Sequence, residues 1–150
     1  MRKFIISIDA GTTSNRSILF DLKGNPVFSS QKEFTQYFPK NGWVEHDPEE
    51  IWKTTTKTLK EVIQKAKKLK GKILSIGITN QRETTVLWDK KTGKTVYKAI
   101  VWQDRRTEDY CEKLRKQNKD TAIFNKTGLL IDPYFSATKI KWILDNILNL

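Results

Sequence analysis

The sequence predicts a mixed α/β fold, and three patterns carry that prediction. Short apolar runs separated by turn residues fill the first third of the chain, which is typical of consecutive strands. A long amphipathic run with helix-start signals follows, and another apolar strand comes after it. Strands joined by tight links, then a helix and a further strand, predict a mixed sheet with an antiparallel three-strand meander and flanking helices.

Three strands are expected near the start of the chain. Phe4–Asp9 is an Ile-rich run that suits a buried central strand, and Arg16–Asp21 and Val27–Phe34 are the second and third strands. Leu22–Pro26 lies between the last two and contains Gly, Asn and Pro, each of which favours a turn. The tight connections predict antiparallel pairing of neighbouring strands.

A helix is expected from Asp47 onward. Asp47 can cap free amides, Pro48 suits the first helical position, and Glu50 has the spacing of a capping box. Lysines gather in the last turns, where cations interact favourably with the helix dipole, and Gly71 is the expected stop. The apolar positions that recur at helical spacing are Ile51, Thr55, Leu59, Val62, Ile63 and Ala66.

The middle of the chain continues the α/β pattern. Ile73–Thr79 is predicted as another buried strand. Thr84–Trp88 and Val96–Trp102 flank the turn Asp89–Gly93, and Thr107–Gln117 has the pattern of a short helix.

A last helix is expected from Ser136. It places Ile140, Ile143, Leu144, Ile147 and Leu148 on one face. The pattern reaches Leu150 with no Gly, Pro or polar exit, which a natural domain end usually carries. We therefore expect residues 1–150 to be one domain truncated at its C-terminal end, whose apolar stripe would make the isolated chain self-associate.

Composition limits the class of protein. With 150 residues, of which 37% are hydrophobic, the chain fits one packed domain or part of a larger one. The net charge of +11 permits binding to nucleic acid or anionic membranes. However, the lysines are scattered or lie on one helix face without a nucleic-acid-binding motif, which favours a solvated surface. Cys111 is the only cysteine, so a disulfide framework is excluded, and no apolar run of about 18 residues predicts a membrane span. We expect a cytoplasmic protein.

The segment Asp9–Arg16, between the first two strands, is the first candidate site. Gly11 opens backbone conformations closed to other residues, and three hydroxyls follow it beside exposed amides, so the hairpin can cradle a phosphate. Asp9 can hold Mg²⁺ directly or through water, and Arg16 adds a positive charge. An ordinary polar hairpin explains the same residues equally well.

Three further segments have the chemistry of a small-polyol site. Arg82 offers donors and Glu83 offers acceptors at a strand end, and each hydroxyl of a polyol needs both. Taken alone, these two residues are better explained as a surface ion pair in a turn. Trp102 could form an apolar wall or lie in the core, and Tyr134, after a proline turn, has the same two alternatives.

In this order, these segments resemble the N-terminal part of the glycerol kinases, a branch of the sugar-kinase family with the actin and hexokinase ATPase fold. The resemblance runs from Ile6 to about Leu144 and is most specific at Ile78–Thr85. It is also specific at Gly42–Pro48, at Trp102–Thr107, and at Gly128 with Asp132–Ser136. Related pentose and gluconate kinases differ at the counterparts of Arg82 and Glu83, so the resemblance favours a polyol role for both.

The resemblance implies a ribonuclease-H-like domain that phosphorylates glycerol to sn-glycerol 3-phosphate with ATP and Mg²⁺. Asp9 would hold the metal, Asp9 and Arg82 would be catalytic, and Thr12 would also approach the transferred phosphoryl group. The nucleotide phosphates would contact Thr12, Thr13, Ser14 and Arg16, and glycerol would contact Arg82, Glu83, Trp102 and Tyr134.

The general-base Asp and most of the adenine pocket are expected in later sequence. The implied partners are therefore glycerol, ATP and the remaining C-terminal part of the kinase, with a homo-oligomer at full length, no nucleic acid and no membrane span. The isolated chain is expected to be inactive. A kinase for another polyol or sugar of the same family is one alternative. A non-catalytic nucleotide- or nucleic-acid-binding module is the other.

Overall fold

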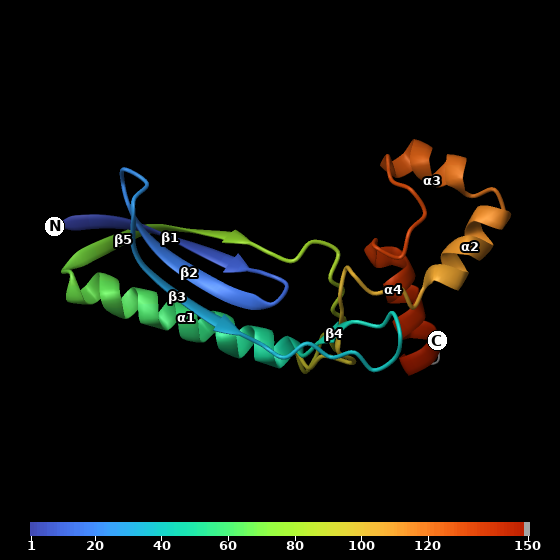
Figure 1. Ribbon diagram of the computed structural model, residues 1–150, viewed down its shortest axis with the longest axis horizontal. Coiled ribbons are helices and arrows are strands. Elements are labelled where there is room, and N and C mark those ends of the chain that lie inside the picture. The colour runs from blue at the N-terminus through green and yellow to red at the C-terminus, as the bar shows by residue number, and fades with distance from the viewer. Residues whose placement is uncertain (149–150) are drawn as a thin grey trace. The chain divides into compact units, whose positions relative to one another are not determined.

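The computed structural model describes residues 1–148, which divide into two compact units (Figure 1). Unit 1 comprises Met1–Thr35 and Asp47–Gln81. Unit 2 comprises Gln36–His46 and the chain from Arg82 onward. The backbone therefore passes from one unit to the other after residues 35, 46 and 81.

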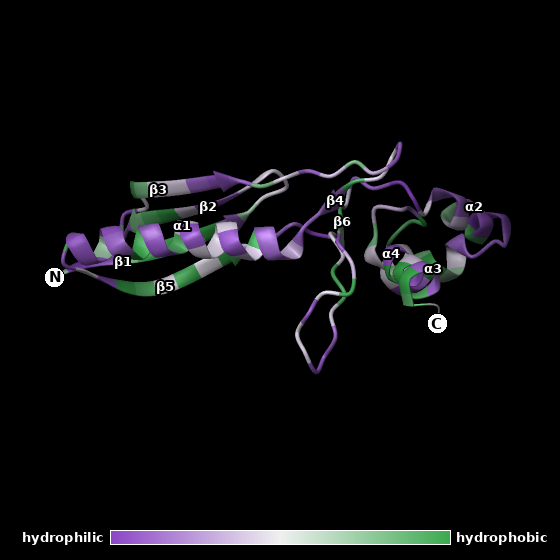
Figure 2. Ribbon diagram, turned by 90° about the horizontal axis from the view of Figure 1, so that it is seen from below, coloured by the Kyte–Doolittle hydropathy of each residue, from purple (hydrophilic) through white to green (hydrophobic). Residues whose placement is uncertain are grey.

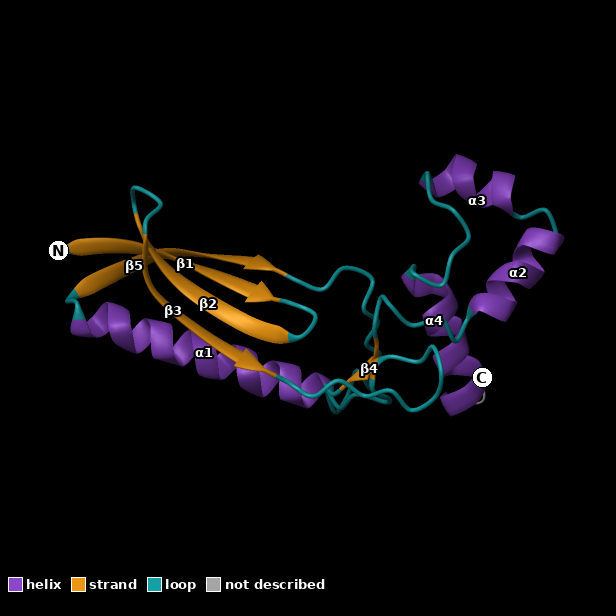
Figure 3. Ribbon diagram, in the orientation of Figure 1, coloured by secondary structure: helices purple, strands orange, loops and turns teal. Residues whose placement is uncertain are grey.

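Unit 1 is built on a four-stranded sheet with the order β3-β2-β1-β5 (Figure 3). The strands are β1 (Arg2–Ala10), β2 (Ser14–Asp21), β3 (Pro26–Glu33) and β5 (Gly71–Thr79). The first three pair antiparallel in sequence order, while β5 runs parallel to β1. The predicted mixed sheet and its antiparallel meander are therefore confirmed.

Helix α1 (Pro48–Lys68) packs on one face of this sheet, as Figures 1 and 2 show. Its predicted start is confirmed, because the Asp47 side chain accepts a hydrogen bond from the backbone N–H of Glu49. Glu50 accepts hydrogen bonds from the backbone N–H and the hydroxyl of Thr35. Alternate residues of β1 turn inward to meet the helix. The buried core consists of Phe4, Ile6, Ile8, Leu19, Val62 and Ala66.

The predicted stop of this helix at Gly71 is wrong. The helix ends at Lys68, and Lys70 takes the left-handed conformation with a φ of 53°. Gly71 is instead the first residue of β5. A Cβ atom there would lie 2.1 Å from the ring of Phe4, so Gly71 is required by the close approach of that ring.

The prediction that Ile73–Thr79 forms a buried strand is half right. The strand exists as β5, but it lies at the sheet edge and exposes Leu74, Ile76 and Ile78, the last to 73%. Figure 2 shows the hydrophobic colour along β5. An apolar run indicates that a strand has an apolar face, but not which element covers that face.

The regular secondary structure of unit 2 is mainly helical, with one short antiparallel pair between β4 (Glu45–His46) and β6 (Ala99–Ile100), and long irregular segments connect these elements. The predicted hairpin around Asp89–Gly93 is reduced to the isolated bridges Thr85–Ile100 and Trp88–Thr95. Its turn is formed as expected, since the Asp89 carboxylate accepts hydrogen bonds from the backbone N–H groups of Lys91 and Thr92.

The helices of unit 2 are α2 (Glu108–Lys116), α3 (Asp120–Thr127), α4 (Ser136–Ile143) and the π-helical turn η1 (Leu144–Leu148). Helix α2 confirms the prediction over Thr107–Gln117, whereas α3 was not predicted. The last helix starts at Ser136 as expected. Its predicted continuation to Leu150 includes residues 149–150, which lie outside the described residues.

The predicted exposed stripe on the last helix is only partly present. Ile143 is completely buried, while Ile140 and Leu148 are exposed. No helix within residues 1–148 is both long enough and apolar enough to span a membrane.

Candidate active site

The hairpin between β1 and β2 carries the residues predicted to contact phosphate. Gly11 donates its backbone N–H to the Ser14 carbonyl over 3.0 Å, which closes the turn. A Cβ atom on Gly11 would lie 2.9 Å from that carbonyl oxygen, so the tight turn requires glycine. Thr13 is exposed, and Thr12 and Ser14 are half-buried. The hydroxyl of Ser14 already accepts a hydrogen bond from Gln31.

Asp9 and Arg16 face each other across the β1–β2 ladder. Their Cα atoms are register partners, and the Arg16 Nη2 lies 3.1 Å from the Asp9 Oδ2. Both side chains are partly exposed, so the pair contributes little to stability. The pair holds the carboxylate beside the hairpin and leaves it accessible to a ligand.

A magnesium ion fits this carboxylate only if phosphate and water complete its coordination. Within residues 1–148, no group of three or more His, Cys, Asp or Glu side chains is placed to hold a metal. Mg²⁺ keeps several waters and is commonly bound by one or two carboxylates together with substrate phosphates. Asp9 alone would therefore suit a metal that a phosphate ligand carries with it.

Asn15 joins the end of the hairpin to α1, a role that the sequence analysis did not predict. It is completely buried, and its amide donates to the Ile51 carbonyl over 3.0 Å and to the Thr54 hydroxyl over 2.6 Å. The next inward residue of β2, Ser17, is hydrogen-bonded to Thr58 over 2.9 Å. The available signal was that two polar residues occupy alternate positions of β2 in step with the inward-facing Leu19.

In unit 2, Glu83 is held by the start of α4. Its carboxylate accepts hydrogen bonds from the backbone N–H of Ser136 over 2.9 Å and from the Ser136 hydroxyl over 2.7 Å. Glu83 has a φ of 62°, an uncommon left-handed conformation for a residue with a side chain. Arg82, immediately before it, is exposed.

Two aromatic residues complete a cluster with Glu83. The ring centroids of Trp102 and Tyr134 lie 6.0 Å apart at 65°, in an edge-to-face arrangement. The Trp102 backbone N–H donates to the Thr84 hydroxyl, and the Tyr134 N–H donates to the Asp132 carboxylate. Trp102 is 36% exposed, so its placement in the core is ruled out. The structure thus brings Glu83, Trp102 and Tyr134 together, with Arg82 next in the chain.

The segment that carries Trp102 rests on a buried charged network. The Arg106 side chain is fully buried and donates to Asp104 and Glu45, with each closest contact at 2.8 Å. Its guanidinium also lies over the ring of Trp43, 3.9 Å from the centroid, and 4.6 Å from that of Trp142. Asp104 in turn accepts the Val44 N–H over 2.6 Å. Sequence reasoning treated these residues only as part of a specific motif and did not recognise their structural role.

His46 is buried, with its Nε2 2.6 Å from the side-chain oxygen of Gln36. Cys111 is also buried, and this burial raises the pKa of its thiol, which disfavours a nucleophilic role.

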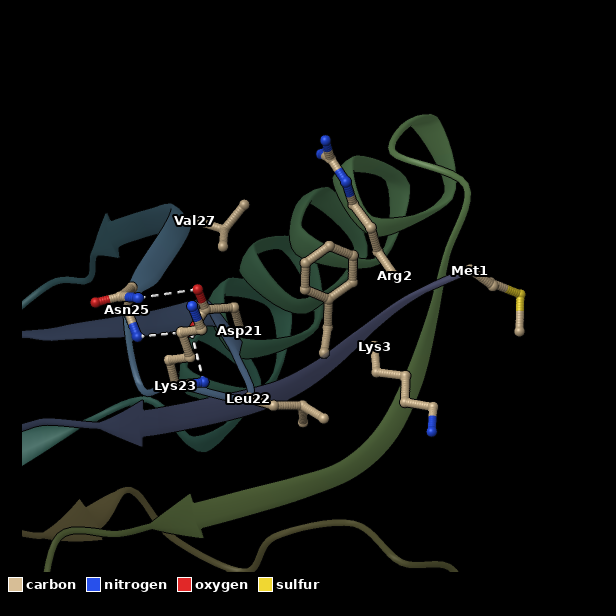
Figure 4. A pocket seen from close by; sticks show the side chains of 9 residues that line it. Met1, Arg2, Lys3, Asp21, Leu22, Lys23, Asn25 and Val27 are labelled. Carbon is tan, nitrogen blue, oxygen red and sulfur yellow. Dashed lines mark hydrogen bonds between the residues drawn. The ribbon is translucent and has the colours of Figure 1, made fainter.

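A hollow of about 570 Å³ lies in unit 1 at the opposite ends of β1 and β2 from the hairpin (Figure 4). The Asp21 carboxylate accepts hydrogen bonds there from Asn25 and from the backbone N–H of Lys23. These bonds lower the pKa of Asp21, and those from Asn25 are the largest cause. None of the predicted site residues lines the hollow, whose lining residues are Met1, Arg2, Lys3, Phe4, Asp21, Leu22, Lys23, Asn25 and Val27.

The sequence is similar to glycerol kinases over almost its whole length. It is 61% identical over 145 residues to the glycerol kinase of Oceanobacillus iheyensis and 60% identical over 146 residues to that of Malacoplasma penetrans. In each case the match covers 97% of this chain and 29% of the relative. The chain therefore spans less than a third of the length of these relatives.

The structure is similar to solved carbohydrate kinases. A crystal structure of Plasmodium falciparum glycerol kinase with ADP matches with a TM-score of 0.90 and 40% identity, over 97% of this chain and 29% of that chain. Gluconate kinase from Lactobacillus acidophilus matches with a TM-score of 0.88 and 25% identity, over the same shares of the two chains. These neighbours confirm the predicted actin- and hexokinase-like α/β fold.

The family model for the N-terminal domain of the FGGY carbohydrate kinases matches residues 4–149. That range holds the hairpin at Asp9, the cluster around Glu83 and all other predicted site residues. The chain therefore belongs to the FGGY family of carbohydrate kinases and corresponds to its N-terminal domain.

Proposed function

We propose that this chain is the N-terminal part of an ATP-dependent kinase that converts glycerol to sn-glycerol 3-phosphate. The observation that carries the proposal is the cluster of Glu83, Trp102 and Tyr134, with Arg82 beside it. The glycerol kinases to which the chain is 56–61% identical support the choice of substrate.

The cluster has the groups that a three-carbon polyol requires. Glu83 accepts hydrogen bonds and Arg82 donates them, so a hydroxyl between them can satisfy both of its roles. Trp102 and Tyr134 present ring faces and edges to the carbon backbone, and the Tyr134 hydroxyl adds a further donor and acceptor. We assign all four residues to glycerol.

The hairpin of unit 1 is assigned to the nucleotide. Thr12, Thr13 and Ser14 offer hydroxyls and amides to the ATP phosphates, and Arg16 offers positive charge. Asp9 would hold Mg²⁺, which when bound neutralises charge on the phosphates. Since ATP, the phosphoryl donor, is supplied inside the cell, we place the activity in the cytoplasm.

In the proposed reaction a terminal glycerol oxygen attacks the γ-phosphorus of ATP. The bond between that phosphorus and the bridging oxygen breaks, and ADP leaves with the electron pair. The hydroxyl proton passes to a general base, which we assign to the C-terminal part that the relatives carry. The residues of this chain bind and orient the two substrates, which is the larger part of catalysis in phosphoryl transfer.

The test uses a completed enzyme in which this chain is joined to the C-terminal part of the Oceanobacillus iheyensis glycerol kinase. ADP release is measured with glycerol, gluconate and xylulose, and the unextended chain is the negative control. We expect turnover with glycerol only. Equal or better turnover with gluconate or xylulose would mean that glycerol is not the preferred substrate. In a separate measurement, binding of random DNA at near-physiological salt would favour a nucleic-acid-binding module.

Two variants of the completed enzyme separate the two sites. Arg82→Ala should raise the glycerol KM by about 10- to 100-fold and leave the ATP KM nearly unchanged, because a charge-assisted hydrogen bond is lost. Asp9→Asn should chiefly lower kcat, by about 100-fold or more, because charge stabilisation during transfer is lost. Arg2→Ala, at an exposed arginine of the hollow, is the matched control and should change neither constant. An Arg82→Ala enzyme that binds ATP weakly and glycerol normally would contradict the assignment.

A further inference from the structure

Lys139 on α4 differs from every other lysine that the structure describes, because it alone is completely buried. Its ammonium donates one hydrogen bond to the backbone carbonyl of Glu83 over 2.8 Å and another to that of Tyr134 over 2.7 Å. Burying an ammonium group is costly unless its hydrogen bonds are satisfied. The function of this buried ammonium is therefore indicated by the two residues that it contacts.

The two carbonyls belong to two of the residues that we assign to glycerol. Glu83 and Tyr134 are 51 positions apart in the sequence, and each stands in a segment without regular secondary structure. A single ammonium therefore joins two separate segments at the residues whose side chains face the polyol. The link acts on the backbone, so it occupies neither the Tyr134 hydroxyl nor the Glu83 carboxylate, whose Oε2 accepts hydrogen bonds from Ser136.

The same helical turn holds Glu83 at two points. Ser136, the first residue of α4, donates to the carboxylate, and Lys139, three residues later, donates to the backbone carbonyl of Glu83. Glu83 has a left-handed backbone, a conformation that persists only when its surroundings hold it in place. The two contacts supply that constraint at both ends of the residue.

The charges around Lys139 favour its protonated form at neutral pH. Burial lowers the pKa of Lys139 to about 8, while the carboxylates of Glu83, Asp104 and Asp132 oppose that shift and the guanidinium of Arg106 adds to it. The ammonium is therefore largely charged at pH 7. Hydrogen bonds from a charged donor are stronger than those from a neutral amine.

We propose that Lys139 is a positioning residue for the polyol site, and that it acts by fixing the backbones of Glu83 and Tyr134 at the spacing that glycerol requires. The inference rests on the proposed function. It goes beyond that function by assigning substrate affinity to a residue that does not touch the substrate.

The experiment replaces Lys139 by Met in the completed enzyme, which keeps the length of the side chain and removes its donors. We expect the glycerol KM to rise by about tenfold or more while the ATP KM stays within about twofold. Lys141→Met is the matched control, because Lys141 lies on the same helix, is exposed and pairs with Asp145. It should leave both constants unchanged.

The outcomes separate positioning from a merely structural role. A folded Lys139→Met enzyme with an unchanged glycerol KM overturns the inference, and so does an equal rise in both KM values. A reference enzyme without turnover on glycerol refutes the proposed function, and with it this inference. If the unsubstituted enzyme turns over glycerol and Lys139→Met leaves the glycerol KM unchanged, the inference is refuted and the proposed function stands.

If Lys139→Met does not fold, the pH profile of the unsubstituted enzyme decides. Deprotonation of Lys139 weakens its two hydrogen bonds, so the glycerol KM should rise at least about threefold from about pH 7 to about pH 9 with a flat ATP KM. A glycerol KM that does not change over this range overturns the inference.

Discussion

Replacing Arg106 by Met tests whether the buried charged network holds unit 2 together. The substitution removes a fully buried guanidinium and leaves the carboxylates of Glu45 and Asp104, which are 5% and 1% exposed, without their cation. Breaking a buried ion pair by removing one partner costs about 3–5 kcal/mol. The lost stacking of the guanidinium on Trp43 and Trp142 adds about 1 kcal/mol, so we expect a loss of roughly 4–6 kcal/mol.

The assay is urea unfolding of the chain followed by tryptophan fluorescence, since Trp43 and Trp142 both contact the guanidinium and report on this region. Arg105→Met is the matched control. Arg105 is the adjacent residue, but it is half exposed and pairs at the surface with Glu108 and Asp132, so it should cost less than about 1 kcal/mol. Both variants remove one positive charge, and only the burial of that charge differs.

A third variant examines the cause. Combining Arg106→Met with Glu45→Gln and Asp104→Asn removes the uncompensated charges, so it should recover part of the loss. An Arg106→Met chain within about 1 kcal/mol of the parent would refute the reasoning. Equal losses for Arg105→Met and Arg106→Met would also refute it, because burial would then make no difference.

Three other predictions concern stability and association. Gly71→Ala should lower the free energy of unfolding in urea by about 1–3 kcal/mol, since the new methyl group meets the ring of Phe4. Gly24→Ala is the control, which reports only backbone strain because nothing lies within 4 Å of a Cβ atom there. Ile78→Lys on the exposed β5 should reduce self-association of the chain in light scattering, and an unchanged mass distribution would exclude this edge as its cause. Lys139 binds a proton less tightly in the folded chain than in the unfolded one, so its burial cost is fully present below pH 8 and disappears as the pH rises to 10.5. The free energy of unfolding, relative to Lys139→Met, should therefore rise by about 3 kcal/mol across that window, and parallel pH curves would contradict this.

Much of unit 1 could be predicted from sequence because its signals are local. The Ile-rich run Phe4–Asp9 marked β1, and Asp47 with Pro48 marked the start of α1. The end of α1 was mispredicted, because Gly71 serves the ring of Phe4 and not the helix terminus. That requirement arises from packing between strands distant in sequence, which no local pattern contains.

Unit 2 was harder to predict because distant contacts define it. Arg106 and Glu45 are separated by 61 residues, and Lys139 and Glu83 by 56. The chemistry of Glu83, Trp102 and Tyr134 was readable from residue type and from the resemblance to sugar kinases. The groups that hold these residues in place were not, since a buried lysine and an exposed one look alike in a sequence.

The excursion of residues 36–46 out of unit 1 has a consequence for protein engineering. The points where the chain leaves and re-enters are fastened to each other, because Thr35 donates two hydrogen bonds to the Glu50 carboxylate. The two ends of residues 36–46 are thus held together by unit 1 itself. Because the cost of closing a loop depends only weakly on its length, shortening this segment changes the closure entropy little. A Gly-rich linker in place of residues 36–46, with the chain ended at Gln81, would give a continuous miniature protein that keeps the sheet, α1 and the hairpin at Asp9. Nucleotide titrations of that miniature would measure the affinity of the hairpin alone for nucleotide, because Trp102 and Tyr134 of the polyol cluster are absent from it.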